Sequence, residues 1–393
     1  MVKPNINLLA VIVAVPVIGM TIISPALTVI KDDLNISFSD TQLILTLYFI
    51  FLALGQILSG PFSDKYGRKP ILLLGASIYS ISAFLASLSS NIEILLILRC
   101  FQGFGAAACL SVGRTILSDC FEIKEAAKQM SKMTAIMAVI PISCFIFGGF
   151  LADFLGWRTN LIALGIISLL LIVCMLLMLQ ETLETKAKSI SFYNMFLVYK
   201  GLVKNNSFNF FTVTTAMQTS MFFAMNGFMP YEFARKGVSI SEFGIWFSLT
   251  SVGYIFGNII NSRLSPLLGL EKMCLIGTVC SFTTVFIFFI NNNFLENGPL
   301  ALSLICVLFG CSNGFAVANS MTGAINSSEL NKGAASGLMG AFQVGSGGLA
   351  GFLIIFFGGA QNFNICLYAL FIMSGISIIS SYLILQIKKM SII

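Results

Sequence analysis

Long apolar stretches alternate with short polar connections along the whole chain. Twelve of these stretches come close to the roughly 20 residues that an α-helix needs to cross a bilayer. The pattern predicts an all-α membrane protein with twelve transmembrane helices, near residues 6–28, 41–61, 70–90, 93–115, 131–155, 159–180, 207–229, 242–262, 273–291, 299–321, 334–357 and 363–386. The first stretch follows Lys3, as a secretory signal would, but its length and its internal Pro16 and Pro25 favour a retained helix.

The composition supports this prediction and excludes several classes of site. Of the 393 residues, 57% are hydrophobic and 10% are charged, whereas a soluble domain carries about 25% charged residues. Histidine is absent and no two of the ten cysteines form a CxxC pair, so we expect no metal, no disulfide and no cofactor. A membrane enzyme is disfavoured, because Arg99 is the only charge deep inside a predicted helix.

The basic residues set the expected topology. With a cytoplasmic N-terminus, the outer loops hold only Lys31, Arg158, Arg235 and Lys236, and Arg99 lies within a helix, which leaves 17 of the 22 lysines and arginines on the inner side. This asymmetry predicts that both termini are cytoplasmic. The net charge of +6 is then a topological signal, and no nucleic-acid partner is expected.

The longest connection, at about 181–206, divides the predicted helices into two groups of six, 1–180 and 207–393. Shifting the chain on itself by 202 positions aligns GFLADFLGWRTN (149–160) with GFLIIFFGGAQN (351–362), and Gly67 then falls on Gly269. The shared residues are common types, so chance similarity is the alternative. A duplicated six-helix unit is the interpretation that we adopt.

Residues 60–70, GPFSDKYGRKP, concentrate charge between two predicted helices. So short a connection must turn sharply, and glycine adopts backbone conformations that other residues resist. Asp64 falls on the side of the membrane where the eleventh predicted helix begins, near Lys332 and Gly333. A carboxylate there would meet the positive end of that helix dipole, worth about 0.3 to 1 kcal/mol when exposed. The stretch predicts a latch between the two halves; a basic loop that only sets topology is the alternative.

The fourth predicted helix contains a second unusual stretch, RCFQGFGAA at 99–107. A buried arginine is costly in a bilayer, so Arg99 is expected to face the bundle interior and to have a partner. Gln102, one turn later, shares its face, while Gly103 and Gly105 permit a neighbouring helix to approach closely. A direct role for Arg99 in substrate or proton handling and a purely structural role both remain open.

These features resemble the major facilitator superfamily, whose fold consists of two pseudo-symmetric six-helix bundles. Its signature G-x-x-x-D-x-x-G-R-K/R is matched at every position between the second and third helices. Arg114 and Asp119 resemble a second cytoplasmic charge pair of the antiporters in this superfamily. The resemblance implies a cytoplasmic gate that stabilises the outward-open state, formed by Gly60, Asp64, Gly67, Arg68, Lys69, Arg114 and Asp119.

At the level of subfamily, RCFQGFGAA, GCSNGF (310–315) and GAASGLMGAFQ (333–343) resemble the bicyclomycin-resistance (Bcr/CflA) type of drug/proton antiporters. Two departures stand out. Thr21 occupies the place where these relatives carry an aspartate before Pro-Ala-Leu, and the paired glycines Gly148 and Gly149, expected to pack the fifth helix, lack the preceding Gly-Pro. The architecture implies a substrate or proton pathway lined by Thr21, Ser24, Arg99, Gln102, Gln218, Met221, Phe222, Met225, Asn226, Ser312 and Asn313.

The sequence thus predicts a secondary active transporter that works by alternating access, and multidrug or metabolite efflux by proton antiport is the preferred interpretation. Uptake or facilitated transport of a neutral or anionic metabolite or siderophore is the alternative, and a non-transporting receptor or an enzyme is less favoured. Because the one deep charge is positive, neutral or anionic substrates are expected over permanent cations, with proton coupling weak or through an end carboxylate such as Glu93 near Arg99. We expect a monomer in the bacterial inner membrane.

Overall fold

The structure, a computed structural model, describes residues 4–121, 123–183, 192–295, 298–327 and 332–392. Within these ranges all regular structure is helical, which confirms the predicted class. The chain separates into two compact units, Met1–Phe192 and Tyr193–Ile393. The boundary between them falls inside the segment expected as a linker.

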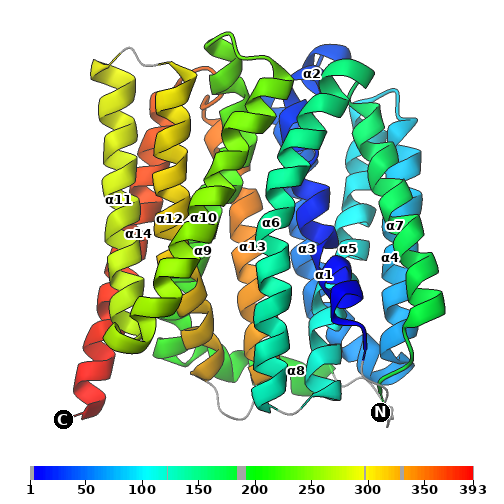
Figure 1. Cartoon of the computed structure of the whole chain (residues 1–393), viewed down its shortest axis with the longest axis vertical. Coiled ribbons are helices and arrows are strands. Elements are labelled where there is room, and N and C mark those ends of the chain that lie inside the picture. Colours follow the sequence, from blue (N-terminus) through cyan, green and yellow to red (C-terminus); the bar gives the residue numbers. More distant parts are fainter. Residues whose placement is uncertain (1–3, 122, 184–191, 296–297, 328–331, 393) are drawn as a thin grey trace. The chain divides into compact units, whose positions relative to one another are not determined.

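The first unit is built from long helices joined by short turns (Figure 1). α5 packs against α3 and α4, α4 also packs against α7, and α1 packs against α5 and α6. A short 3₁₀ turn, Ser24–Ala26, separates α1 from α2. The elements are α1 (Ile6–Thr21), α2 (Leu27–Asp33), α3 (Phe38–Tyr66), α4 (Arg68–Ser87), α5 (Ile92–Cys120), α6 (Ile123–Leu155) and α7 (Arg158–Met178).

The second unit repeats this arrangement and adds one short helix, α8, before it. α12 packs against α10 and α11, and α9 packs against α12, α13 and α14, as their counterparts do in the first unit. The elements are α8 (Phe192–Val203), α9 (Asn206–Arg235), α10 (Ile240–Leu268), α11 (Leu270–Phe294), α12 (Pro299–Asn326), α13 (Lys332–Phe356) and α14 (Phe363–Ile392).

Backbone conformation at the turns reveals the duplication. The described residues with positive φ form three pairs, each related by the shift that aligns the two halves of the sequence. Two N-terminal capping boxes, Ser37 with Asp40 and Ser239 with Glu242, are related by the same shift. Turn geometry is therefore shared where side chains differ. The φ pairs are Asn35 (51°) and Gly237 (75°), Gly67 (113°) and Gly269 (84°), and Gly156 (86°) and Gly358 (94°).

Eleven of the described helical segments are long and apolar enough to cross a membrane, where the sequence suggests twelve. The twelfth expected span, 207–229, lies in α9, which at 30 residues is long enough. α9 carries many threonines, serines and amides, and most of its side chains are buried within the second unit. A helix that is largely shielded from lipid need not be apolar throughout.

Glycines bring paired helices into backbone contact. Gly253 and Gly257 of α10 face Gly310 and Gly314 of α12, and a β-carbon on any of the four would overlap backbone atoms of the other helix. In the first unit, Gly103 abuts the α3 backbone and Gly105 abuts that of α4, a close approach that the sequence predicts. Small residues spaced by four allow such packing in a membrane, where no hydrophobic effect draws helices together.

We expect Gly257→Ala to lower the melting temperature of the purified protein by several degrees, equivalent to about 1 to 3 kcal/mol of overpacking. The added methyl group would meet the carbonyl of Cys311. Gly375→Ala in α14 is the matched control, because its β-carbon would meet nothing within 4 Å. Equal melting temperatures for the two variants would show that the α10–α12 contact is not tight.

Candidate functional site

A break in the first membrane helix leaves a backbone carbonyl inside the first unit available to accept a hydrogen bond from a side chain. Pro25 cannot donate a backbone hydrogen bond, and the chain passes from α1 through a 3₁₀ turn into α2. The freed carbonyl of Ile22 accepts a hydrogen bond from Asn160 Nδ2 of α7 at 2.9 Å, and the same amide also donates to the Gly148 carbonyl at 3.1 Å. Asn160 therefore bridges the broken helix and α6.

Arg99 of α5 binds a neighbouring part of α1. Its side chain is completely buried, and the guanidinium donates to the carbonyls of Ile44 (3.2 Å) and Gly19 (3.1 Å) and to Gln102 Oε1. Its Cζ atom also lies 4.2 Å from the centre of the Tyr48 ring. All these partners are uncharged, so a full positive charge is held by neutral oxygens and an aromatic face.

Two tyrosines complete this cluster. The hydroxyl of Tyr48 donates to the Pro16 carbonyl at 3.0 Å. A β-carbon on Gly19 would lie 2.6 Å from the Tyr48 hydroxyl oxygen and 2.5 Å from that of Tyr79. The absence of a side chain at Gly19 thus allows both tyrosine hydroxyls to lie close to the α1 backbone. We call Arg99, Gln102, Tyr48, Tyr79 and Gly19 the arginine cluster.

Thr21 and Ser24, at the break in α1, are completely buried. Thr21 Oγ1 donates to the Val17 carbonyl one turn earlier, at 2.7 Å. Gly148, the first of the paired glycines of α6, is buried nearby, and a β-carbon on it would overlap the Ile22 backbone. A small residue in α6 therefore permits close contact with the broken helix.

The second unit holds a seam of buried hydroxyl and amide groups. Gln218 of α9 donates to Ser377 Oγ of α14 at 3.0 Å and accepts from Ser281 of α11 at 2.7 Å. Ser281 in turn lies 2.8 Å from Ser312 of α12, oxygen to oxygen. All four side chains are at most 1% exposed. Four helices are thereby joined through polar contacts, and two predicted pathway residues, Gln218 and Ser312, belong to the seam.

The other predicted pathway residues of the second unit are distributed along α9 and α12. Met221, Met225 and Asn226 are buried, and Phe222 is half-buried. Asn226 Nδ2 donates to the Phe222 carbonyl at 2.7 Å. Asn313 is 5% exposed, and its Nδ2 atom has no hydrogen-bond partner among the described residues. Whether these side chains contact substrate stays a prediction.

The charged turn between α3 and α4 centres on Arg68. Its guanidinium binds Asp64 at 2.5 Å, Asp119 at 2.8 Å and Ser63 Oγ at 2.6 Å. The side chain of Arg68 is 6% exposed, while that of Asp64 is 52% exposed. The resemblance implies a charge pair of Arg114 with Asp119, which stays a prediction. In the structure Asp119 forms an ion pair with Arg68, because the start of α4 lies beside the end of α5.

A carboxylate from beyond α7 completes this turn. Gly67, the residue before α4, has no side chain to cap the helix. Glu181 supplies the cap, accepting from the Arg68 amide at 2.9 Å and the Lys69 amide at 3.2 Å. Lys69 Nζ also donates to the Leu176 carbonyl at 3.1 Å. An anion at a helix N-terminus is favourable, so Glu181 ties the segment after α7 to the turn.

Hydrogen bonding changes the acidity of Glu181, which lies outside the candidate membrane spans. Partial burial alone would raise its pKa, but four backbone amides donate to the carboxylate, and the net result is a pKa below its ordinary value of 4.5. The donors are the amides of Leu183, Arg68, Lys69 and Thr182. Folding therefore favours the ionised form.

We expect Glu181→Gln to melt at a lower temperature than the unchanged protein at pH 7, since the ionised group stabilises the fold above its unfolded pKa. That contribution is lost as the pH falls below about 4.5 and through the depressed folded value, so the difference should close in acid. Glu93→Gln is the control, because Glu93 is exposed on the first turn of α5 and forms no ion pair with described residues. A gap that is constant with pH would contradict the capping role.

Glu93, expected near Arg99, is exposed on α5, whereas Arg99 is buried and its described hydrogen bonds are to Ile44, Gly19 and Gln102. A carboxylate that the sequence did not single out is buried instead in the second unit. Glu232 is 6% exposed and binds Arg235 at 2.7 Å and Lys236 at 3.8 Å. It was overlooked because α9 extends beyond the expected end of its span at residue 229.

In each unit a charged side chain at an equivalent position, 33 in the first unit and 235 in the second, forms hydrogen bonds to a later turn. Asp33, which ends α2, accepts from Trp157 Nε1 at 2.9 Å and from Arg158 at 2.7 Å. Arg235, which ends α9, donates to the Gln361 carbonyl at 2.7 Å. The duplicated turn is thus held in both units, by side chains of opposite charge.

Comparisons with known proteins agree with this architecture. Residues 9–351 match the Major Facilitator Superfamily. The chain is 26% identical over 359 residues to the bicyclomycin resistance protein homolog of Haemophilus influenzae, covering 88% of this chain and 87% of that protein. It is 26% identical over 357 residues to multidrug resistance protein D of Escherichia coli, covering 88% of each. The solved D-xylose-proton symporter has the same fold, with a TM-score of 0.74 over 96% of each chain at 13% identity.

Proposed function

We propose, from the premise that the chain belongs to the Major Facilitator Superfamily, that it exports small molecules in exchange for protons and prefers neutral or anionic substrates. Membership makes the chain a multi-pass membrane transporter and not an enzyme, and its bacterial relatives place it in the inner membrane. Superfamily transporters bind small molecules and typically act as monomers. The direction of transport, the coupling and the substrate charge form the proposal, together with cytoplasmic termini.

The direction is supported by the relatives. The Haemophilus relative is named for bicyclomycin resistance and the Escherichia relative for multidrug resistance. A membrane transporter that confers resistance does so by removing the compound from the cell. Both relatives match along nearly the whole chain, so the inference does not depend on one shared segment.

The preference for uncharged or anionic substrates rests on the arginine cluster. Arg99 is completely buried and its described partners are all neutral. Thr21 stands where related antiporters carry an acid, so α1 offers no carboxylate beside that charge. An uncompensated buried cation repels a second one strongly in a low dielectric. A permanent cation would therefore bind poorly near this cluster.

Proton coupling without an acid in the middle of α1 requires carboxylates elsewhere. Asp64 and Asp119 at the charged turn and Glu232 in α9 are candidates, because each contacts a basic group within its own unit. All three lie near the ends of their helices, α3, α5 and α9, and none lies in the first membrane helix. We therefore propose coupling that is weaker than in relatives with an acid in the first helix.

Reconstituted vesicles test the proposal. We expect bicyclomycin and other uncharged drugs to be transported at a rate that rises when a pH gradient is imposed, and ethidium to be transported at least tenfold more slowly. Vesicles without protein give the background rate. Ethidium transport equal to that of neutral compounds would overturn the substrate proposal, and rates indifferent to the gradient would overturn the coupling.

A further inference from the structure

α8 differs from the other helices in length and setting. It has 12 residues, too few to cross a bilayer, and it lies at the ends of the long helices of its unit (Figure 1). α9 begins shortly after α8 ends. Both faces of α8 are largely apolar, which is unusual for a helix at a protein surface.

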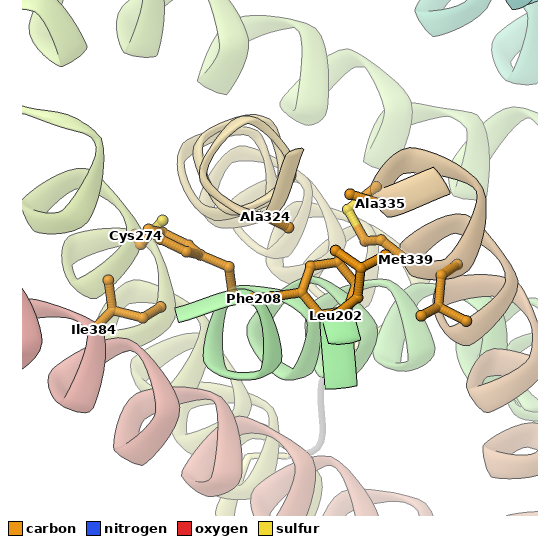
Figure 2. Close-up of a cluster of buried hydrophobic side chains, with 9 residues drawn as sticks. Leu202, Phe208, Cys274, Ala324, Ala335, Met339 and Ile384 are labelled. Atoms are coloured by element: carbon orange, nitrogen blue, oxygen red, sulfur yellow. The ribbon is translucent and has the colours of Figure 1, made fainter. Parts of the chain in front are cut away.

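The inner face of α8 is already occupied. Leu202 is 4% exposed and belongs to a buried cluster that draws on the ends of five other helices. Figure 2 shows this cluster, with Leu202 beside Phe208 of α9 and Met339 of α13. Val198 and Tyr199 pack against the same cluster. The helix is therefore fixed to its unit through one face.

The outer face of α8 is exposed and carries large apolar groups together with lysines. Phe196 is 60% exposed, Leu197 45% and Val203 50%. Phe196, Lys200 and Val203 follow the spacing i, i+4, i+7 and form one stripe on the helix. Lys204 follows directly after the helix, and residues 192–206 contain no acidic side chain. The outer face thus combines apolar anchors with positive charge and no acidic neighbour within the segment.

Hydrogen bonds place α8 at the depth where the membrane spans end. Asn205, between α8 and α9, donates to the Ser327 carbonyl at 3.0 Å, and Ser327 directly follows the candidate span Pro299–Asn326. Asn209 Nδ2 donates to the Val203 carbonyl at 2.6 Å. The corner between α8 and α9 is thereby held level with the end of this candidate span.

We propose that α8 is an interfacial helix whose outer face lies among the headgroups and binds anionic phospholipids. Phe196, Leu197 and Val203 enter the boundary between headgroups and acyl chains, as the apolar side of an interfacial helix does. Lys200 and Lys204 extend their charged ends to lipid phosphates. Each lysine near an anionic surface increases affinity by about fivefold, so the pair selects anionic over zwitterionic lipid.

Tryptophan fluorescence of the full-length protein tests the location. Phe196→Trp is reconstituted in vesicles of phosphatidylcholine with phosphatidylglycerol as the minor component, with and without acyl-chain bromination. The spectrum of the unchanged chain is subtracted to remove the contribution of Trp157 and Trp246. We expect at least twofold stronger quenching by brominated lipid than for Tyr199→Trp, the control on the inner face. A variant whose melting temperature falls is replaced by Leu197→Trp.

Two results would overturn the location. Quenching by aqueous acrylamide but not by brominated lipid would place the outer face in water. Quenching by neither would show that protein covers it.

Lipid selectivity is measured with bromine on one lipid class at a time. We expect brominated phosphatidylglycerol to quench Phe196→Trp several-fold better than brominated phosphatidylcholine at equal mole fraction. Adding Lys200→Glu and Lys204→Glu should abolish that difference while quenching by lipid in general persists. Equal quenching by the two lipids in the variant with both lysines intact would overturn the anionic preference.

Discussion

Replacing Arg99 with alanine is expected to abolish transport and to lower the melting temperature of the protein, whereas Arg99→Lys should retain part of both. The guanidinium donates to three buried acceptors, the carbonyls of Gly19 and Ile44 and the side chain of Gln102. A buried acceptor left without a donor costs about 1 to 3 kcal/mol. A lysine ammonium can satisfy some of these acceptors but not in the planar geometry of arginine.

A second variant separates the contribution of Arg99 to transport from its contribution to stability. Gln102→Ala removes one neutral acceptor and keeps the charge, so its melting temperature should fall less than that of Arg99→Ala. Transport is measured in vesicles at equal protein abundance, and melting in the same detergent. Transport by Arg99→Ala at the unchanged rate would leave Arg99 with a packing role alone and would remove the main support for the substrate preference.

The arginine cluster shows what the sequence could and could not predict. Arg99 and Gln102 were found because a charge inside an apolar stretch demands a partner, and Gln102 follows one turn later. Tyr48 and Tyr79 were not found, because an aromatic residue in a membrane helix gives no sign of which neighbour it meets. Helical spacing identifies residues on one face, but contacts between helices depend on packing that spacing does not encode.

The break in α1 and the seam in the second unit show the same limit. The sequence predicts one span at 6–28 and not the break at Ser24–Ala26, and nothing in it connects this break to Asn160, which lies 138 positions from Ile22. Gln218 and Ser312 were predicted to line a pathway from the superfamily architecture, and within their unit they bind other polar side chains. The positions of the turns were easier to predict from the sequence, since glycines with positive φ, such as Gly67 and Gly269, occupy equivalent turns in the two units.

The duplication and the signature turn were predictable for a common reason. Both depend on local chemistry, the duplication on glycines at equivalent turns and the signature turn on charges at fixed spacing, so both can be recognised without knowledge of tertiary contacts. The ion pair of Asp119 with Arg68 was not predicted, because it depends on the end of α5 meeting the start of α4, which is a tertiary contact. Glu181 was missed as a cap for the same reason, since 113 positions separate it from Arg68.

We expect Asp64→Asn to reduce transport at least tenfold while leaving the melting temperature nearly unchanged. Asp64 is half exposed, and an exposed ion pair contributes only about 0 to 1 kcal/mol. Arg68 keeps its ion pair with Asp119 in this variant, so the turn stays folded. A large functional loss with little destabilisation would place the role of Asp64 in the transport cycle, as the predicted latch near Lys332 requires.

Arg68→Ala provides the contrast, because it should lower both transport and melting temperature. Its removal deprives Asp119, whose side chain is 22% exposed, of its cation and leaves Ser63 without its donor. Lys65→Ala is the control for charge alone, since Lys65 lies on the same turn and forms no described ion pair. Normal transport by well-inserted variants of both Asp64 and Arg68 would exclude the gate. A loss confined to Arg68→Ala would make the turn a structural brace, because the gate requires the negative charge of Asp64 as well as the fold that Arg68 maintains.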